Sequence, residues 1–358
     1  MRKWVLTSTV LSIITALTAN GVALAQDPAG PDPEASQTFV PPLKSPDLNP
    51  APENANISRS SEDVTISRDA ITIDESWMAP DPTKPAHVRF VLSLPEMPPF
   101  TASCVNASIC APVANSADSN YFAVTAKIDG KPVSLKVVTK ASVSGRDITA
   151  LLIDEHIPLM TDSKASQDAL ARLKPETLAK WSNEKDSWVD NEGADAIYGG
   201  WTVSSELSFE ADIPAGGALS TEIKYQPSVG HGLGANFLGH DEGANHTLVD
   251  HEQRYCLDDG FMKSVRKMAD NSKPYGWKGL WERQLVFDLL SPVAGKTQAG
   301  DFRLVVDKGS NKDDLVSFCG HVVKKLSATS WQVQPFDGEH GTPTKDFEVL
   351  FISQPEKN

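Results

Sequence analysis

The stretch YFAVTAKIDGKPVSLKV, residues 121–137, contains the pattern that decides the fold. Apolar side chains alternate with polar or small ones on both sides of Asp129-Gly130, a dipeptide typical of the tight turn in a β-hairpin. The alternating apolar residues are Phe122, Val124, Ala126, Ile128, Val133, Leu135 and Val137. The stretch therefore predicts two antiparallel, half-buried strands joined by a two-residue turn.

The same period of two recurs along much of the chain outside this hairpin. It is found in residues 64–66, 71–73, 88–94, 202–211, 219–225, 302–307, 315–319, 331–333 and 347–352. Turn residues separate nearly all of these segments, and antiparallel strands are the ones that short turns can join. The sequence predicts a mainly β protein, an antiparallel β-sandwich-like arrangement with a few short helices inserted.

Helical spacing is confined to two regions. Residues 163–183 carry apolar side chains at helical intervals, and Pro175 suits the first position of a second helix, so two short helices are expected. A further helix is expected after Asp258 or Asp259, one of which would cap it. The stretch between 230 and 252 is rich in glycine and polar residues, which indicates a long surface loop.

The N-terminal residues carry signals for export. Two basic residues precede an apolar run, and the small residues at 23–25 match a signal peptidase site, so residues 1–25 are expected to be a cleaved signal peptide. Residues 26–60 hold eight of the 25 prolines and few apolar side chains, which predicts a disordered linker. The expected location is periplasmic or secreted.

The remainder of the chain divides by pattern into three regions. Residues 61–160 are expected to form an N-terminal β-sandwich domain and residues 161–200 a helical insertion. Residues 201–353 are expected to form a C-terminal β-rich region with one helix.

Composition excludes several classes of partner. The chain has 47 acidic and 33 basic residues, a formal net charge of -14, which argues against nucleic acid or an anionic membrane as the main partner. After cleavage of the signal peptide no apolar stretch of about 20 residues is left, so no transmembrane segment is expected.

Four cysteines form an even set, for which three pairings exist on counting alone. Cys104 and Cys110 lie six residues apart in a loop of polar and small residues, so their pairing needs only local closure. That leaves Cys256 with Cys319. Structural disulfides are the expected use of cysteine in an exported protein, and the bridge that closes the longer loop should stabilise more.

The densest polar cluster lies between residues 230 and 260. It contains four of the eight histidines, His231, His240, His246 and His251, with carboxylates interleaved. Imidazoles and carboxylates could hold a divalent metal such as zinc, and an open coordination position could activate water. The irregular spacing fits no known ligand motif, so no cofactor is expected and a metal-dependent hydrolase is kept as the alternative.

Aromatic residues suggest a second kind of site. Tyr275, Trp277 and Trp281 lie among glycines and could form an exposed patch on which a sugar ring stacks. Trp181 and Trp201 lie in apolar patterns and are expected in the core. A carbohydrate-binding module is therefore a further alternative.

Six phrases, taken in order, carry a resemblance to a known family. They are GKPV at 130–133, DITALL at 147–152, YQPSVG at 225–230, YCLDD at 255–259, DFRLVVDKG at 301–309 and LVSFCG at 315–320. Together they resemble an exported bacterial family described only as a domain of unknown function, over about residues 61–353. The resemblance implies a periplasmic location and supports the pairing of Cys256 with Cys319, and it brings no catalytic residues.

The N-terminal part carries a second likeness. Leu94-Pro95 and the hairpin at 129–131 resemble the sandwich domain that precedes von Willebrand A domains in inter-α-trypsin inhibitor heavy chains. This likeness is short and implies a sandwich only.

No dinucleotide-binding, Walker, nucleophile-elbow or zinc-protease motif is found in the sequence. The sequence therefore favours an exported binding or assembly module of the cell envelope without catalytic activity. Its expected partner is an envelope protein or a glycan.

Overall fold

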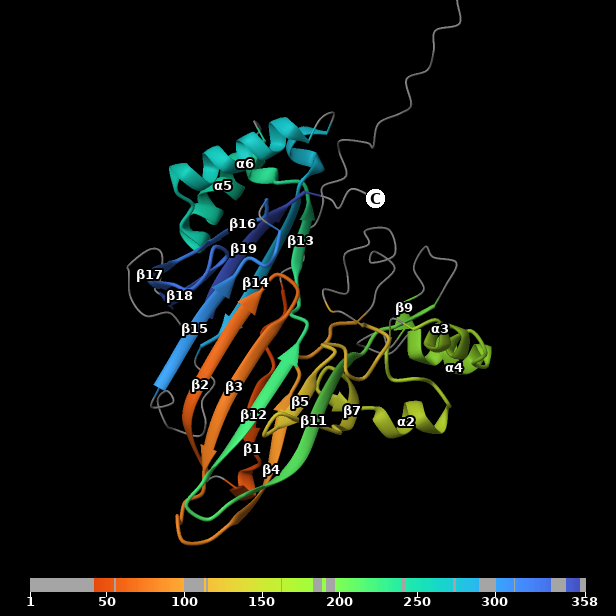
Figure 1. Ribbon diagram of the computed structural model, residues 1–358. Coiled ribbons are helices and arrows are strands. Elements are labelled where there is room, and N and C mark those ends of the chain that lie inside the picture. The colour runs from red at the N-terminus through yellow and green to blue at the C-terminus, as the bar shows by residue number, and fades with distance from the viewer. Residues whose placement is uncertain are drawn as a thin grey trace, which may run out of the picture. The chain divides into compact units, whose positions relative to one another are not determined.

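The computed structural model describes residues 42–54, 56–99, 113, 115–161, 163–182, 189–190, 197–239, 242–272, 275–289, 301–311, 313–335 and 346–354. Residues 37–358 belong to one compact unit. Among the described elements, strands dominate and most neighbouring strands are antiparallel, so the predicted mainly β fold is confirmed (Figure 1). None of the described helices is both long and apolar enough to cross a membrane.

Two large sheets form the sandwich. The eight-stranded sheet has the order β17 (Gly320–Lys325), β18 (Ser330–Pro335), β15 (Asp301–Asp307), β2 (Ser58–Ser67), β3 (Ile71–Met78), β12 (Ala218–Tyr225), β5 (Thr125–Ile128) and β6 (Lys131–Val133). The five-stranded sheet has the order β1 (Asp47–Pro50), β4 (Ala86–Ser93), β11 (Thr202–Ile213), β7 (Lys136–Val143) and β8 (Arg146–Asp147). Trp77 of β3 and Phe90 of β4 join the two sheets, with ring centroids 5.1 Å apart.

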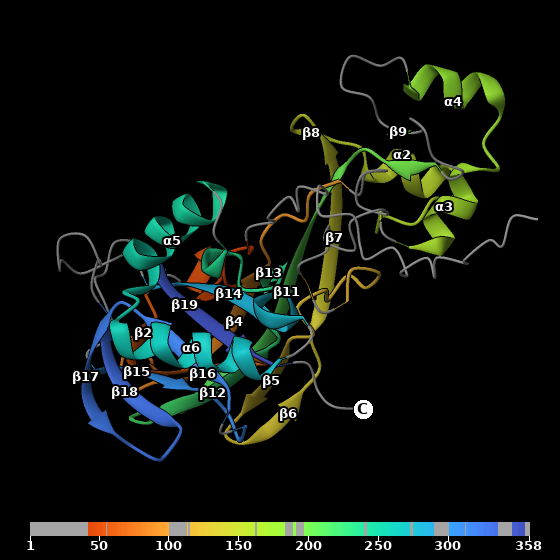
Figure 2. The ribbon, with the colours of Figure 1, turned by 90° about the horizontal axis from the view of Figure 1, so that it is seen from above.

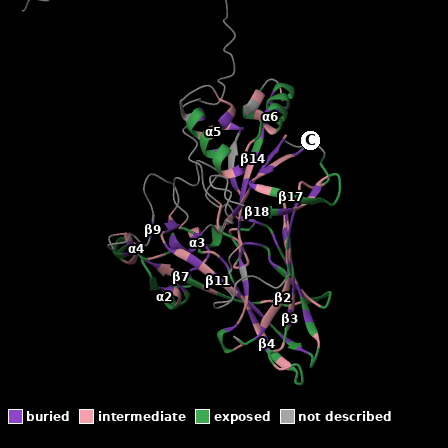
Figure 3. Cartoon of the chain, turned by 90° about the vertical axis from the view of Figure 1, so that its left-hand side faces the viewer, coloured by how far each residue is buried: buried purple, intermediate pink, exposed green. Residues whose placement is uncertain are grey.

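A four-stranded sheet extends the sandwich. Its order is β13 (Gly230–Leu233), β14 (Trp281–Asp288), β19 (Asp346–Ser353) and β16 (Leu315–Phe318). The alternation of β19 divides its side chains between two cores: Val349 and Phe351 join the sandwich core, whereas Leu350 and Ile352 pack with the helices α5 (Glu242–Tyr255) and α6 (Asp259–Asn271). Figure 3 shows buried residues concentrated on the strands and exposed ones on helices and loops.

The predicted hairpin at 121–137 is present as β5 and β6. Asp129 and Gly130 both have positive φ, 47° and 76°, as a tight hairpin turn requires. Phe122 and Val124 are buried in the sandwich core but precede the paired strand. The period of two therefore marked the buried face correctly up to Ala126 and overestimated the length of both strands. Val137 lies on β7 of the other sheet and is 38% exposed.

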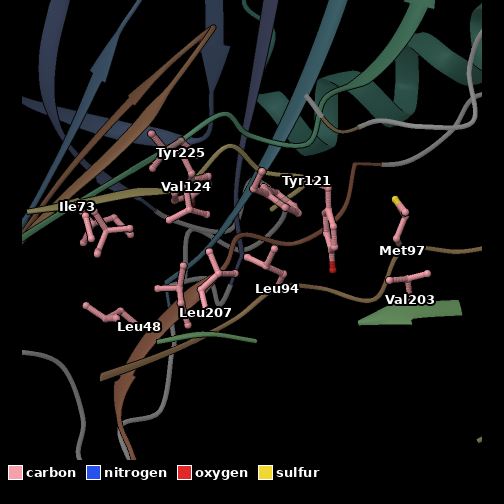
Figure 4. Packing of buried hydrophobic residues seen from close by; sticks show 14 of the residues in the cluster. Leu48, Ile73, Leu94, Met97, Tyr121, Val124, Val203, Leu207 and Tyr225 are labelled. Carbon is pink, nitrogen blue, oxygen red and sulfur yellow. The ribbon is translucent and has the colours of Figure 1, made fainter. Parts of the chain in front are cut away.

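The predicted linker is wrong over its second half. Residues 47–50 form β1, which pairs with β4, and Leu48 is buried in the sandwich core (Figure 4). Ala51 and Ile57 are buried as well. An edge strand tolerates proline because one of its sides needs no backbone donor, so the high proline content does not prevent pairing here.

The predicted boundary between the regions 61–160 and 201–353 does not separate two packing units. β2 pairs with β15 in parallel, and β11 lies between β4 and β7, so both regions contribute strands to the same sheets. This pairing joins residues about 240 positions apart, which no local sequence pattern could indicate.

The described helices confirm two predictions. α3 (Lys164–Leu170) and α4 (Pro175–Ser182) are the two short helices expected, and Pro175 is the first residue of α4. A short α2 (Thr149–Asp154) precedes them. The Asp258 side chain caps α6 by accepting the backbone N–H of Phe261 at 2.6 Å.

The stretch predicted as a loop between 230 and 252 contains α5, so the described residues of the C-terminal region form two α-helices rather than one. The helical signal is a stripe at intervals of four, three and four residues, formed by Ala244, Leu248, His251 and Tyr255. One member of the stripe is a histidine, and glycines precede it. The apolar periodicity is therefore too weak to predict a helix here.

Candidate functional site

Of the two histidines in the cluster whose side chains are described, His251 is the buried one. It is 4% exposed on α5, and its Nε2 lies 2.7 Å from Oε1 of Glu282 on β14. The Gln284 amide donates to the same carboxylate oxygen, and the Tyr255 hydroxyl donates to the Gln284 Oε1 at 2.7 Å. Burial raises the pKa of Tyr255 far above its usual value, which keeps this hydroxyl protonated as a donor.

Of the four histidines, the structure describes the side chains of His246 and His251, and it does not bring these two together. His246 is exposed, five residues before His251 on α5, and five helical residues rotate a side chain well away from the first. His231 is on β13, where the structure describes the backbone alone, and His240 lies outside the described residues. In the part of the chain that the structure describes, no three His, Cys, Asp or Glu side chains are placed to hold a metal ion.

The surroundings of His251 indicate a packing role. The rings of Phe237 and Tyr255 lie 5.1 and 5.3 Å from its ring, centroid to centroid. Its Nδ1 has no hydrogen-bond partner among the described residues, and the Asp250 carboxylate is 3.9 Å away. A nucleophile activated by this imidazole would need to lie within hydrogen-bond reach of it, and none is described there. The network thus fixes α5 on β14.

The predicted pairing of Cys256 with Cys319 is confirmed, with Cα atoms 5.0 Å apart. Cys256 follows α5 directly with a positive φ of 51°, and Cys319 directly follows β16. The bridge closes a sequence separation of 63 residues, for which loop entropy predicts a stabilisation of about 4 kcal/mol. Cys104 and Cys110 lie outside the described residues.

Two of the three predicted patch aromatics have described side chains. Tyr275 is 70% exposed and Trp281, the first residue of β14, is 43% exposed. The Arg283 guanidinium lies 6.0 Å from the Trp281 ring centroid and forms an ion pair with Asp69 at 2.8 Å. For Trp277, on the short 3-10 helix η3 (Gly276–Gly279), only the backbone is described. Trp181 and Trp201 are in the core, as predicted.

Sequence reasoning missed an exposed apolar edge. β17 is the terminal strand of the eight-stranded sheet, and among the described strands it pairs with β18 alone. Val322 and Val323 are 54% and 59% exposed, and Leu326 just after the strand is 40% exposed. A β-bulge between Val322 and Lys324 leaves Val323 outside the pairing register. The signal in the sequence is HVVKK at 321–325.

A second strand, β7, has a similar sequence, KVVTK at 136–140. Its valines are less exposed, 38% for Val137 and 42% for Val138, and β8 pairs with residues 142–143 of its outer edge. β17 and β7 lie far apart in both ribbon views (Figures 1 and 2). β17 is therefore the more open of the two edges.

The fold and its bridge define a mainly β, disulfide-containing protein with helices packed on one of its sheets. The chain belongs to the family described as Domain of unknown function (DUF4424), whose model matches residues 51–350. This match confirms the predicted resemblance to a family of unknown function.

No curated protein matches the chain. A crystal structure of a "putative nutrient binding protein" from Legionella pneumophila is similar, with 9% sequence identity, a TM-score of 0.37, and coverage of 87% of this chain and 70% of that chain.

Proposed function

We propose that this protein is an exported, non-catalytic assembly module of the cell envelope, which docks an extended segment of a partner protein along β17. The observation that carries the proposal is the exposure of Val322, Val323 and Leu326 on an open sheet edge. An extended segment that adds to such an edge gains backbone hydrogen bonds and covers the apolar side chains. Covering the two valines would contribute roughly 2 kcal/mol.

The charges on β17 define the chemistry of the partner. Lys324 and Lys325 are exposed, and neither forms an ion pair with a described residue. In a chain with a net charge of -14, two unpaired lysines beside exposed valines favour an extended segment that combines acidic and apolar side chains. A second copy of this chain that paired through the same edge would place its lysines against these lysines. Lysines on edge strands oppose self-pairing in this way.

Export and the absence of catalysis rest on other features. The apolar run and small residues within positions 1–25 support a signal peptide, and the Cys256–Cys319 bridge is compatible with an oxidising compartment. The main alternative is a metal-dependent hydrolase that uses His231, His240, His246 and His251. Of the two with described side chains, His246 faces solvent and His251 is buried against Glu282, so this pair does not contribute to one site.

The docking proposal predicts a swap of charge preference. The mature protein should bind a short peptide of alternating valine and glutamate more tightly than one of alternating valine and lysine. Reversing the edge charges, Lys324→Glu with Lys325→Glu, should weaken binding of the glutamate peptide by about tenfold or more and favour the lysine peptide. Fluorescence anisotropy of labelled peptides measures both affinities.

The matched control changes the same charge elsewhere. Lys136 and Lys140 are exposed on β7, which lies far from β17 in both ribbon views (Figures 1 and 2), so Lys136→Glu with Lys140→Glu should leave the peptide preference unchanged. Equal losses in both double variants would show that net charge alone attracts the peptide, and the docking site on β17 would be rejected.

A second candidate function is glycan binding at Trp281 and Tyr275. Their exposure, with Arg283 beside the Trp281 ring, is the observation that favours it, because a flat ring next to a charged donor suits a sugar. Loss of signal on a glycan array in Trp281→Ala, with unchanged thermal stability, would support this function. An empty array for the parent protein would reject it.

A further inference from the structure

A cavity lined by residues of α3, α4 and the connections that follow α2 and α3 lies apart from β17 and from the aromatic patch. Its volume is about 350 Å³, and it is open to solvent between the end of α2, the end of α3 and the start of α4. Ala169 and Leu173 form the apolar part of the lining, whereas the other lining side chains are polar or charged. The volume is ample for a ligand the size of a phosphate ester headgroup.

Three basic side chains line this cavity: His156, Arg172 and Lys174. All three are exposed, and none of them forms an ion pair or a side-chain hydrogen bond with a described residue. A neighbouring base on the same insertion behaves differently, since Lys164 pairs with Asp168 at 3.0 Å. Glu155 also lines the cavity. Its one negative charge is outweighed by the two positive charges of Arg172 and Lys174, so the lining keeps a net positive charge.

The backbone places His156 at this wall at a conformational cost. α2 ends in two closing hydrogen bonds, from the His156 N–H to the Ile153 carbonyl and from the Ile157 N–H to the Leu152 carbonyl. In this helix ending the residue at the position of His156 takes a left-handed conformation that favours glycine, and its φ is 57°. A histidine held in this conformation beside a cavity points to a role for its side chain.

The polar groups suit an oxyanion. Arg172 offers a planar fork of donors, Lys174 a point charge, and Thr177 a hydroxyl on the first turn of α4. We propose that this cavity binds a phosphate group, held by Arg172 and Lys174 and contacted by His156. Free phosphate and a phospholipid headgroup share this chemistry.

The test measures binding of inorganic phosphate to the full mature protein by titration calorimetry. Arg172→Ala with Lys174→Ala should weaken binding by about tenfold or more. The control, Lys164→Ala with Lys180→Ala, removes two exposed lysines from α3 and α4 that lie outside the cavity lining, and it should leave the affinity unchanged. Equal affinity in the cavity variant and the parent would overturn the proposal.

The variant His156→Gly separates binding from folding. Glycine relieves the left-handed strain, so the thermal midpoint should rise while phosphate binding weakens. A raised midpoint with unchanged phosphate affinity would remove His156 from the site. Vesicles of phosphatidylglycerol, compared with phosphatidylcholine, distinguish the sources: vesicle binding that depends on Arg172 and Lys174 identifies a headgroup, and binding of free phosphate alone identifies the ion. Absence of both overturns the proposal.

Discussion

Removing residues 26–50 should lower the free energy of unfolding far more than removing residues 26–41. The two deletions differ in residues 42–50, which hold β1 and its contacts. Leu48 is 2% exposed in the sandwich core, and replacing it by alanine alone should cost about 2–5 kcal/mol. The whole segment also carries the backbone pairing with β4. Urea denaturation of the two truncated proteins measures the difference.

The same segment connects the sheets by side-chain contacts. The Leu43 N–H donates to the Ser228 hydroxyl at 2.7 Å, and the Ser45 hydroxyl accepts the backbone N–H of Asp288 at 3.0 Å. Lys44 pairs with Asp346 at 3.3 Å, an exposed contact of little energetic weight. Leu48→Ala serves as the smaller probe where the longer deletion prevents folding. Equal stability of both deletions and of Leu48→Ala would show that the arm is not part of the core.

His251→Ala should destabilise the protein by about 3–5 kcal/mol, because it leaves the Glu282 carboxylate buried without its imidazole partner. His246→Ala, on the exposed side of the same helix, should change stability by less than about 0.5 kcal/mol. Thermal and urea unfolding of both variants, with and without a chelator, measure the effects.

The chelator distinguishes packing from metal binding. In the packing account the parent protein and both variants are indifferent to the chelator, since nothing that stabilises the fold is removed. The metal alternative requires the parent to lose stability in the chelator and each histidine variant to lose bound zinc. A large loss of stability that occurs only in His251→Ala and does not depend on the chelator would support the packing account.

The elements predicted from the sequence are those whose buried faces are mostly apolar. The Asp129-Gly130 turn, Pro175 at the start of α4 and the Asp258 cap of α6 each follow from local chemistry that needs no distant partner. β1 escaped prediction because it is a short strand with one buried apolar residue, Leu48, in a proline-rich segment, and its pairing depends on β4. Local pattern does not encode such a partner.

Polar residues on buried faces concealed two further elements. Glu282 and Gln284 of β14 form hydrogen bonds with His251 and Tyr255 of α5. Neither element therefore presents a continuous apolar stripe. β17 was missed for a different reason. Its two valines are adjacent and show no alternation, so the sequence predicts no strand there, and only the sheet order reveals that β17 lies at an edge.

Amide hydrogen exchange of the full mature protein, with and without the alternating valine and glutamate peptide, tests the docking claim most directly. An added strand must pair with the outward backbone groups of β17, so exchange in residues 320–326 should slow markedly when the peptide is bound. Exchange near Trp281 should stay unchanged. Saturating peptide that leaves the exchange of residues 320–326 unaltered would contradict the proposal that β17 is the docking edge.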